Sequence, residues 1–174
     1  MRKLFSFAVL TVSDSSSRGE REDLSGSAIV EILEDRGYIL SYHAVVPDEE
    51  GMIIEKLKGW AESVDLIVTT GGTGLAPRDV TPEATNKVIE RAAPGLAEAM
   101  RLETAKKTPA AILSRGIAGI RGRCLILNLP GSPRAVKECL EVILPVLDHG
   151  LEILKGSAAG HPLPSSTSAR PRGS

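Results

Sequence analysis

The chain alternates short apolar runs with segments of helical periodicity, and this alternation constrains the fold more than any other feature. The apolar runs, rich in β-branched and aromatic residues, cover residues 4–12, 38–46 and 65–70, as expected of strands. Helical spacing predicts helices over 24–38 and 48–64, between the runs. Near-continuous apolar strands separated by helices are typical of a parallel sheet covered on both faces, because each crossover helix packs back over it. The expected fold class is α/β.

Helix-capping signals indicate where two later helices begin. Thr81 is expected to cap a helix whose first residue is Pro82, where a missing amide hydrogen costs nothing. Ser132 and Pro133 have the same arrangement before the last helix. Pro145 lies inside that last helix, so we expect it to kink or split the helix.

The segment between these two helices is less regular. A helix is expected over residues 94–107. The Arg-Gly pair at 121–122 predicts a hairpin that joins strands at 116–120 and 124–129. The sequence AILSR at 111–115 fits either helix or strand.

Composition and length limit the classes of protein to consider. A chain of 174 residues fits one domain, expected over residues 1–155. Residues 156–174 are rich in serine, proline and small residues, which predicts a disordered tail. No apolar stretch approaches the roughly 20 residues of a membrane span, and the first residues lack a signal-peptide cleavage site. We therefore expect a cytoplasmic protein with no membrane partner. The net charge of −1 gives no overall positive field to attract nucleic acid, so we expect no nucleic-acid partner.

The two cysteines do not suggest a disulfide or a metal site. Cys124 and Cys139 lie outside any CxxC spacing, and each has apolar neighbours. This context favours buried, reduced thiols.

Polar or glycine-rich loops follow all four of the strands that precede a helix. These loops cover residues 13–19, 47–51, 70–79 and 128–133. The carboxyl ends of parallel strands lie along one edge of a doubly wound sheet, where ligands bind at the point at which the strand order reverses. The sequence therefore predicts a binding site at this edge.

The loop after the third strand favours an anion, most simply phosphate. Gly71, Gly72 and Gly74 expose backbone amides and allow close approach, and the helix that begins at Pro82 offers its positive end. The spacing matches neither GxGxxG nor GxxxxGK[ST]. A tight turn with no ligand would also account for these glycines.

Charged residues near this loop suggest a metal. The carboxylate of Asp79 would repel a phosphate unless a cation lay between them, which favours Mg²⁺ bound by one or two carboxylates and by phosphate oxygens. Asp48, at a neighbouring strand end, is the second candidate carboxylate, and Arg78 would add positive charge.

The sequences TTGGTGLAPRDVTPEAT, LTVSDSSSRGEREDLSG and LSRGIAGIRGRCLILNLPGSPRAVKECL closely resemble the molybdopterin-binding MogA/MoaB family of molybdenum-cofactor biosynthesis, which also forms a domain of gephyrin. The resemblance covers residues 4–154. It implies a three-layer α/β/α fold with a mostly parallel sheet and a homotrimer or hexamer. It also implies transfer of an adenylyl group from Mg-ATP to molybdopterin, with release of pyrophosphate. A molybdenum insertion enzyme would be a further partner.

Individual residues match the family's functional motifs. Asp79 matches the aspartate of the PRDVTP motif and Asp48 that of the PDE motif, which implies catalytic and Mg²⁺-binding roles for both. Positions expected to contact nucleotide or pterin are Ser13, Asp14, Gly71, Gly72, Thr73, Gly74, Arg78, Ser114, Pro130, Gly131 and Ser132.

Two alternative functions fit the same motifs. One is a non-catalytic molybdopterin-binding or scaffold protein of the MoaB type, although such paralogues lose both acids and this chain keeps Asp48 and Asp79. The other is a nucleotide or dinucleotide hydrolase, because related domains occur in competence-associated proteins with pyrophosphatase activity. Turnover assays distinguish these alternatives from adenylyl transfer.

Overall fold

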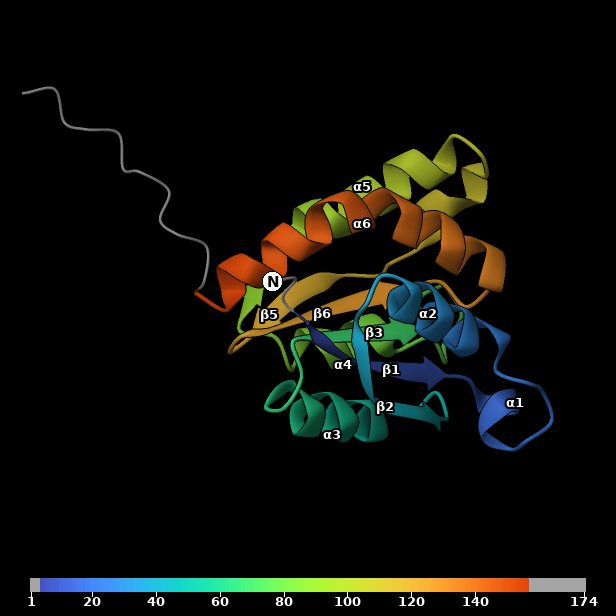
Figure 1. Ribbon diagram of the computed structural model, residues 1–174. Helices are drawn as coiled ribbons and strands as arrows, with labels where there is room; N and C mark the ends of the chain where they lie inside the picture. The colour runs from blue at the N-terminus through green and yellow to red at the C-terminus, as the bar shows by residue number, and fades with distance from the viewer. Residues whose placement is uncertain (1–3, 157–174) are drawn as a thin grey trace, which may run out of the picture.

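The computed structural model describes residues 4–156, which form one six-stranded sheet with helices on both faces (Figure 1). The strand order is β2-β1-β3-β6-β5-β4. The parallel strands are β2 (Ile39–Val46), β1 (Ser6–Val12), β3 (Leu66–Thr70) and β6 (Cys124–Leu129). The antiparallel continuation consists of β5 (Ala118–Arg121) and β4 (Arg91–Ala92). The predicted, mostly parallel sheet is therefore confirmed.

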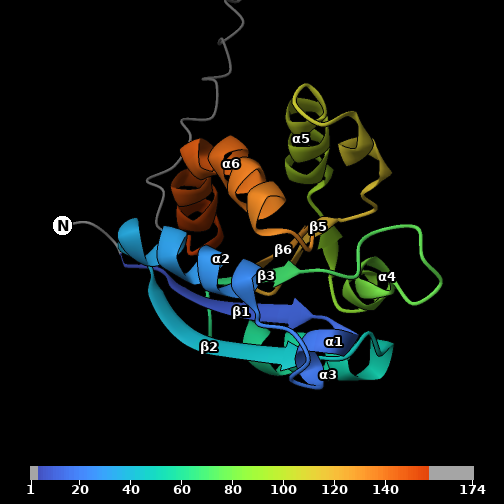
Figure 2. The ribbon, with the colours of Figure 1, turned by 90° about the vertical axis from the view of Figure 1, so that its right-hand side faces the viewer.

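One layer of helices lies on each face of the sheet (Figure 2). The first layer consists of α2 (Leu24–Asp35), α5 (Pro94–Ala105) and α6 (Pro133–Leu154). The second layer consists of α3 (Glu50–Ala61) and α4 (Thr81–Asn86). The expected three-layer α/β/α architecture is present.

Strand β1 shows why the apolar runs are nearly continuous. Phe7 and Val9 belong to the core beneath α2, α5 and α6, whereas Ala8 and Leu10 belong to the core beneath α3 and α4. Successive side chains of a strand point to opposite faces, and here both faces are covered. All of these side chains are fully buried, so no polar alternation appears in the sequence.

The less regular segment resolves into short elements. The hairpin between β5 and β6 is confirmed, but its turn contains Gly122 and Arg123, one residue later than expected. Gly122 has a positive φ of 57°, which explains the glycine there. Much of AILSR forms the end of a 3₁₀ helix, η1 (Pro109–Leu113). Neither β4 nor the short helix α1 (Asp14–Ser17) was expected from the sequence.

Of the three helix signals, one is confirmed, one is wrong, and the helix at Pro145 does not split. Ser132 caps α6 as predicted, and its side chain accepts a hydrogen bond from the amide of Ala135 at 3.1 Å. The expected cap at Thr81 is wrong: Val80 occupies the cap position, because the Thr81 hydroxyl is used elsewhere. The helix α6 runs through Pro145 without splitting, since buried residues on both sides hold it against the core.

Both thiols are buried and unpaired, as expected. Burial raises the pKa of Cys124 to about 12 and that of Cys139 to about 11. Because the thiolate is the nucleophile, we predict that iodoacetamide at pH 8 leaves the native protein unmodified while it alkylates both cysteines in denaturant. Mass spectrometry measures the outcome, and alkylation of the native protein at the rate of the denatured control would contradict it.

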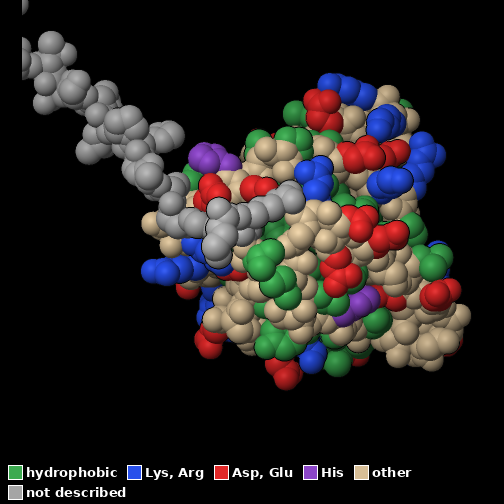
Figure 3. Space-filling model, in the orientation of Figure 1, with side chains coloured by type: hydrophobic (Ala, Val, Ile, Leu, Met, Phe, Trp, Pro, Cys, Tyr) green, Lys and Arg blue, Asp and Glu red, His purple; other side chains and the backbone are tan. Residues whose placement is uncertain are grey.

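The surface is mixed in charge and shows no membrane-spanning element among the described residues. Acidic and basic side chains are interspersed on the face shown in Figure 3. Over residues 4–156, no helix combines the length and hydropathy that crossing a bilayer requires. The tail predicted over residues 156–174 lies outside the described residues except for Gly156. The division into domain and tail therefore stays a prediction.

Candidate active site

The site lies where the strand order reverses. From β1 the chain passes to β2 on one side, and β3 then pairs with β1 on the other. The loops after β1 and β3 therefore meet at the carboxyl edge, as the sequence predicted. The loop after β6 joins them, because the amide of Gly71 donates to the carbonyl of Leu129 at 3.1 Å, and the Thr70 hydroxyl donates to the carbonyl of Pro130 at 2.7 Å.

The glycine loop, residues 71–74, adopts a conformation that other residues would not tolerate. Gly71 and Gly72 have φ values of 93° and 65°. A Cβ on Gly71 would lie 2.2 Å from the carbonyl oxygen of Val12. A Cβ on Gly72 would lie 2.3 Å from the hydroxyl oxygen of Thr81 and 3.1 Å from a carboxylate oxygen of Asp48. Both the positive φ angles and the lack of room for a Cβ therefore require glycine at these two positions.

Thr81 fixes the glycine loop through two hydrogen bonds. Its hydroxyl donates to the carbonyl of Gly71 at 2.9 Å, and its amide donates to the carbonyl of Gly72 at 3.1 Å. Thr81 itself is fully buried. This arrangement explains why Thr81 does not cap α4: its side chain fixes the glycine loop instead.

Several amides of the loop have no partner in the protein. Among residues 4–156, the backbone N–H groups of Gly72, Thr73 and Gly74 donate no hydrogen bond. Thr73 is nevertheless only 5% exposed. Consecutive unpaired amides on residues that line a cavity are suited to an oxygen-rich ligand. The sequence-based expectation of a phosphate-binding loop agrees with this geometry.

Two cavities meet at the glycine loop. Cavity 1 has a volume of about 590 Å³ and cavity 2 a volume of about 400 Å³. Both are lined by Gly71, Gly72, Asp79, Gly131 and Ser132. The site is therefore divided into two compartments with a common floor, which could hold two ligands end to end.

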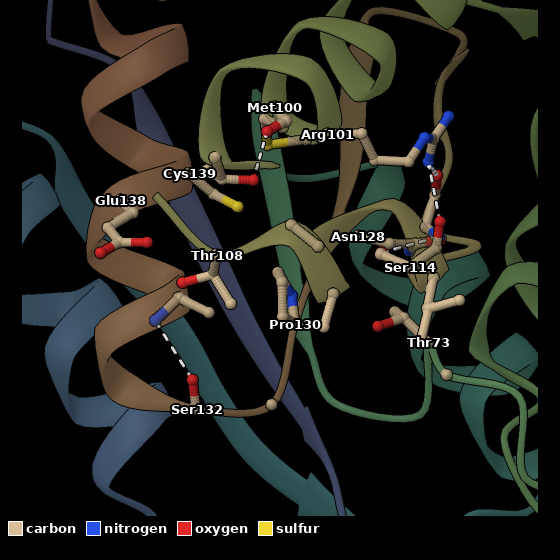
Figure 4. Close-up of a pocket in the computed structure, with 18 of the residues that line it drawn as sticks. Thr73, Met100, Arg101, Thr108, Ser114, Asn128, Pro130, Ser132, Glu138 and Cys139 are labelled. Carbon is tan, nitrogen blue, oxygen red and sulfur yellow. Dashed lines mark hydrogen bonds between the residues drawn. The ribbon is translucent and has the colours of Figure 1, made fainter. Parts of the chain in front are cut away.

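Cavity 1 lies between α5, α6 and the segment before β5 (Figure 4). Ser132 lies at the start of α6 on one side, and Thr73 and Ser114 lie on the other. Met100 and Cys139 supply apolar surface farther from the loop. The cavity thus joins a polar end at the glycine loop to a more apolar wall.

Cavity 2 lies between the loop after β1 and the start of α2. Ser13 and Asp48 line it together with the shared residues. The start of α4, which the sequence analysis expected to face the phosphate, lines neither cavity. The starts of α2, with Leu24 and Ser25, and of α6, with Ser132, border cavity 2 instead.

Asp14 and Arg78 pair with each other outside both cavity linings. The guanidinium of Arg78 donates to both carboxylate oxygens of Asp14, at 2.6 and 2.8 Å. This bidentate hydrogen bonding lowers the pKa of Asp14 to about 2. The structure therefore places these two residues, predicted to contact ligand directly, at the rim, where each neutralises the other.

Asp48 is held facing the glycine loop. Its carboxylate accepts the amide of Asp14 at 3.0 Å, and its own amide donates to the carboxylate of Asp14 at 3.1 Å. The other carboxylate oxygen accepts no hydrogen bond from the described residues. Burial, followed by the negative charges of Asp14 and Asp79, raises the pKa of Asp48.

This raised pKa predicts that Asp48→Asn stabilises the fold. The native state binds the Asp48 proton more tightly than the unfolded chain does, so stability falls as pH rises through the raised pKa. Above the raised pKa this cost is present, and asparagine removes it while keeping an oxygen for the amide of Asp14. We expect a higher Tm at pH 7 and a difference that shrinks in acid. An unchanged or lower Tm at pH 7 would contradict this explanation.

Arg115 is the main residue of the site that the sequence analysis missed. Its Nε donates to the carbonyl of Gly74 and its Nη2 to the carbonyl of Asp79, both at 2.7 Å. It also pairs with the carboxylate of Glu83. The only signal in the sequence was its position beside Ser114 in the LSR motif.

Comparison with known proteins identifies the family of this chain. A family described as a probable molybdopterin binding domain matches residues 8–149. The chain belongs to the MogA/MoaB family. The fold described above is therefore the fold of this family.

Individual members of the family are similar over most of the chain. The molybdopterin adenylyltransferase of Helicobacter pylori (strain ATCC 700392 / 26695) is 46% identical, covering 86% of this chain and 87% of its own length. The molybdenum cofactor synthesis protein cinnamon of Drosophila melanogaster is 44% identical, covering 85% of this chain but 25% of its own. The structure of the molybdopterin biosynthesis enzyme MoaB from Thermus thermophilus is 54% identical, with a TM-score of 0.84, covering 88% of this chain and 98% of that one.

Proposed function

We propose that this chain is a molybdopterin adenylyltransferase of molybdenum-cofactor biosynthesis. It transfers the adenylyl group of ATP to the terminal phosphate of molybdopterin and releases pyrophosphate. One observation carries the proposal: two cavities meet at a run of unpaired amides beside Asp48 and Asp79. The activity named for the similar Helicobacter pylori protein supports it.

We assign molybdopterin to cavity 1 and ATP to cavity 2. Cavity 1 is the larger and has the apolar wall that a fused ring system needs, with Ser114, Pro130 and Ser132 near the loop. Cavity 2 is bordered by Ser13 and Asp48. Phosphates from both ligands would then meet over the shared floor.

The protein's contribution to the reaction is alignment and charge stabilisation. An oxygen of the molybdopterin phosphate attacks the α-phosphorus of ATP, and the bond to the bridging oxygen breaks with its electron pair leaving on pyrophosphate. The amides of Gly72, Thr73 and Gly74 would stabilise the phosphate oxygens. A phosphate is already anionic at pH 7, so no general base is required.

The residues present fit Mg²⁺. A Cβ on Gly74 would lie 2.8 Å from a carboxylate oxygen of Asp79, and a Cβ on Gly72 would lie 3.1 Å from one of Asp48, so both carboxylates line the space over the loop. No cluster of three or more metal-ligating side chains occurs among residues 4–156. Mg²⁺ is commonly bound by two carboxylates together with phosphate oxygens of the substrate. When bound, it would neutralise charge on the reacting phosphates.

Product analysis tests this proposal. Purified protein is incubated with Mg-ATP and molybdopterin, and chromatography follows adenylylated molybdopterin alongside pyrophosphate release. Both products should appear in equal amounts and should depend on Mg²⁺. Tight molybdopterin binding with neither product would instead support the non-catalytic scaffold function.

The remaining expectations stay predictions. Assembly as a homotrimer or hexamer, contact with a molybdenum insertion enzyme and a cytoplasmic location follow from the family resemblance and the sequence. Exposed apolar side chains at Leu75, Leu102, Ile112 and Leu113 offer surface for such contacts.

A further inference from the structure

We propose that Arg115 is a positioning residue that fixes Asp79 relative to the wall of cavity 1, so that a ligand seated against Ser114 also orders the carboxylate loop. The expected effect of Arg115 on catalysis rests on the proposed function. Its effect on the position of Asp79 rests only on the contacts of Arg115. The loop in question, residues 74–80, is called the carboxylate loop below.

Arg115 contacts both ends of the carboxylate loop and its continuation. Its guanidinium donates to the carbonyl of Gly74, where the loop begins, and to that of Asp79, where it ends, both at 2.7 Å. Its amide donates to the carbonyl of Thr73 at 2.8 Å. The third side-chain contact is the ion pair with Glu83 on α4. One side chain thus connects the glycine loop, the carboxylate loop and a helix.

At its last residue the carboxylate loop is fixed to α4, because Val80 accepts the amide of Ala84 at 3.0 Å and packs against the core beneath α3 and α4. The contacts of residues 75–79 apart from those with Arg115 are internal or exposed. Asp79 donates its amide to the carbonyl of Ala76 at 2.9 Å, and its carboxylate accepts the amide of Ala76 at 3.0 Å. These bonds move with the loop and do not fix it to the domain. The pair between Arg78 and Asp14 is a further link, and the Arg78 side chain is 61% exposed, so solvent screens it. Arg115 is the more shielded anchor, with 34% of its side chain exposed.

The segment that carries Arg115 is itself fixed against cavity 1. Arg101 on α5 donates to the carbonyls of Ser114 and Gly116, at 3.3 and 2.6 Å. Ser114 and Arg101 line cavity 1 (Figure 4), and Gly116 lines it as well. A ligand that contacts this wall therefore touches residues on either side of Arg115. The two side-chain hydrogen bonds of Arg115, one to the carbonyl of Gly74 and one to that of Asp79, then couple the wall to the carboxylate loop.

The geometry of the guanidinium matters more than its charge. Arginine presents several N–H donors in a rigid plane, whereas lysine is a point charge on a flexible stem. Arg115→Lys keeps the positive charge beside Glu83 but cannot reach both carbonyls and the carboxylate at once. The Glu83 carboxylate, whose pKa is lowered by Arg115, should remain paired in this variant. The substitution therefore isolates the two carbonyl contacts.

Kinetics and hydrogen exchange of Arg115→Lys test the inference. We expect kcat to fall by about 10- to 100-fold, because small misplacements of reacting groups cost this much, while KM for molybdopterin stays unchanged. Amide exchange should rise at Ala76 and Asp79, the two amides of the carboxylate loop that are hydrogen-bonded, and remain at the wild-type rate in β1 and β3. Arg121→Lys is the matched control, since Arg121 on β5 also donates to a backbone carbonyl, that of Val88 at 3.1 Å.

Two results would overturn the inference. One is an Arg115→Lys protein whose carboxylate loop exchanges at the wild-type rate. The other is a variant in which kcat and KM change together with a general loss of protection, as a purely structural role predicts. If the wild-type protein transfers no adenylyl group, the exchange measurement still decides the positioning role, and only the proposed function fails.

Discussion

Asp79→Asn is expected to lower kcat for adenylyl transfer by at least about 100-fold, the size seen when one electrostatic contact to a transition state is removed. In the wild type the amide of Ala76 donates to the Asp79 carboxylate at 3.0 Å. The asparagine oxygen can still accept this hydrogen bond, so the loop should keep its conformation. Only the charge beside the shared floor of the two cavities is lost. Steady-state kinetics at saturating ATP and molybdopterin measure the effect.

The control for this substitution is Asp35→Asn, which removes an exposed carboxylate at the end of α2, away from the linings of cavities 1 and 2. Its activity should equal that of the wild type. Circular dichroism and thermal unfolding establish that both variants are folded. Wild-type turnover by folded Asp79→Asn would rule out a role for this charge.

Gly71→Ala is expected to have the largest effect on stability. A residue with a side chain is strained at a φ of 93°, and the new Cβ would lie 2.2 Å from the backbone oxygen of Val12, at the end of a central strand. Strain and overpacking together should cost about 2 to 6 kcal/mol in the free energy of unfolding. Denaturant titration measures this loss.

Gly59→Ala is the matched substitution in helix α3. A Cβ there meets no atom within 4 Å, and alanine favours the helix, so unfolding should cost about 0.5 to 1 kcal/mol more. The two variants should therefore shift the unfolding midpoint in opposite directions. A midpoint for Gly71→Ala equal to that of the wild type would show that the loop relaxes freely, contrary to the contacts described.

The parallel strands and the edge that carries the site could be predicted from the sequence. Apolar runs buried on both faces have a clear pattern, and parallel connections force their carboxyl ends to one edge. Asp48 and Asp79 follow different strands, and this rule placed them at the same edge, where both line cavity 2. The glycines at 71 and 72 were identified because they expose amides to a ligand, and the structure adds positive φ angles, which the alternative of a tight turn also required.

The remaining features depend on tertiary contacts that leave no local signal. Asp14 and Arg78 are 64 residues apart, and nothing near either predicts their pairing. Thr81 stands where the sequence predicts a helix cap, but its hydroxyl donates a hydrogen bond to the carbonyl of Gly71 instead. The strand β4 has two residues and forms only because β5 lies beside it. Arg115 acts through carbonyl groups, which every residue has, so its role could not be identified without coordinates.

The most direct measurement follows the α-phosphate of ATP. The protein is incubated with molybdopterin, Mg²⁺ and ATP radiolabelled at the α-phosphate, and the labelled species are separated. If phosphates from the two cavities meet over the glycine loop, the label enters adenylylated molybdopterin in step with pyrophosphate release. Label that stays in ATP while molybdopterin binds, or that appears only in AMP, would contradict adenylyl transfer and favour a scaffold or a hydrolase respectively.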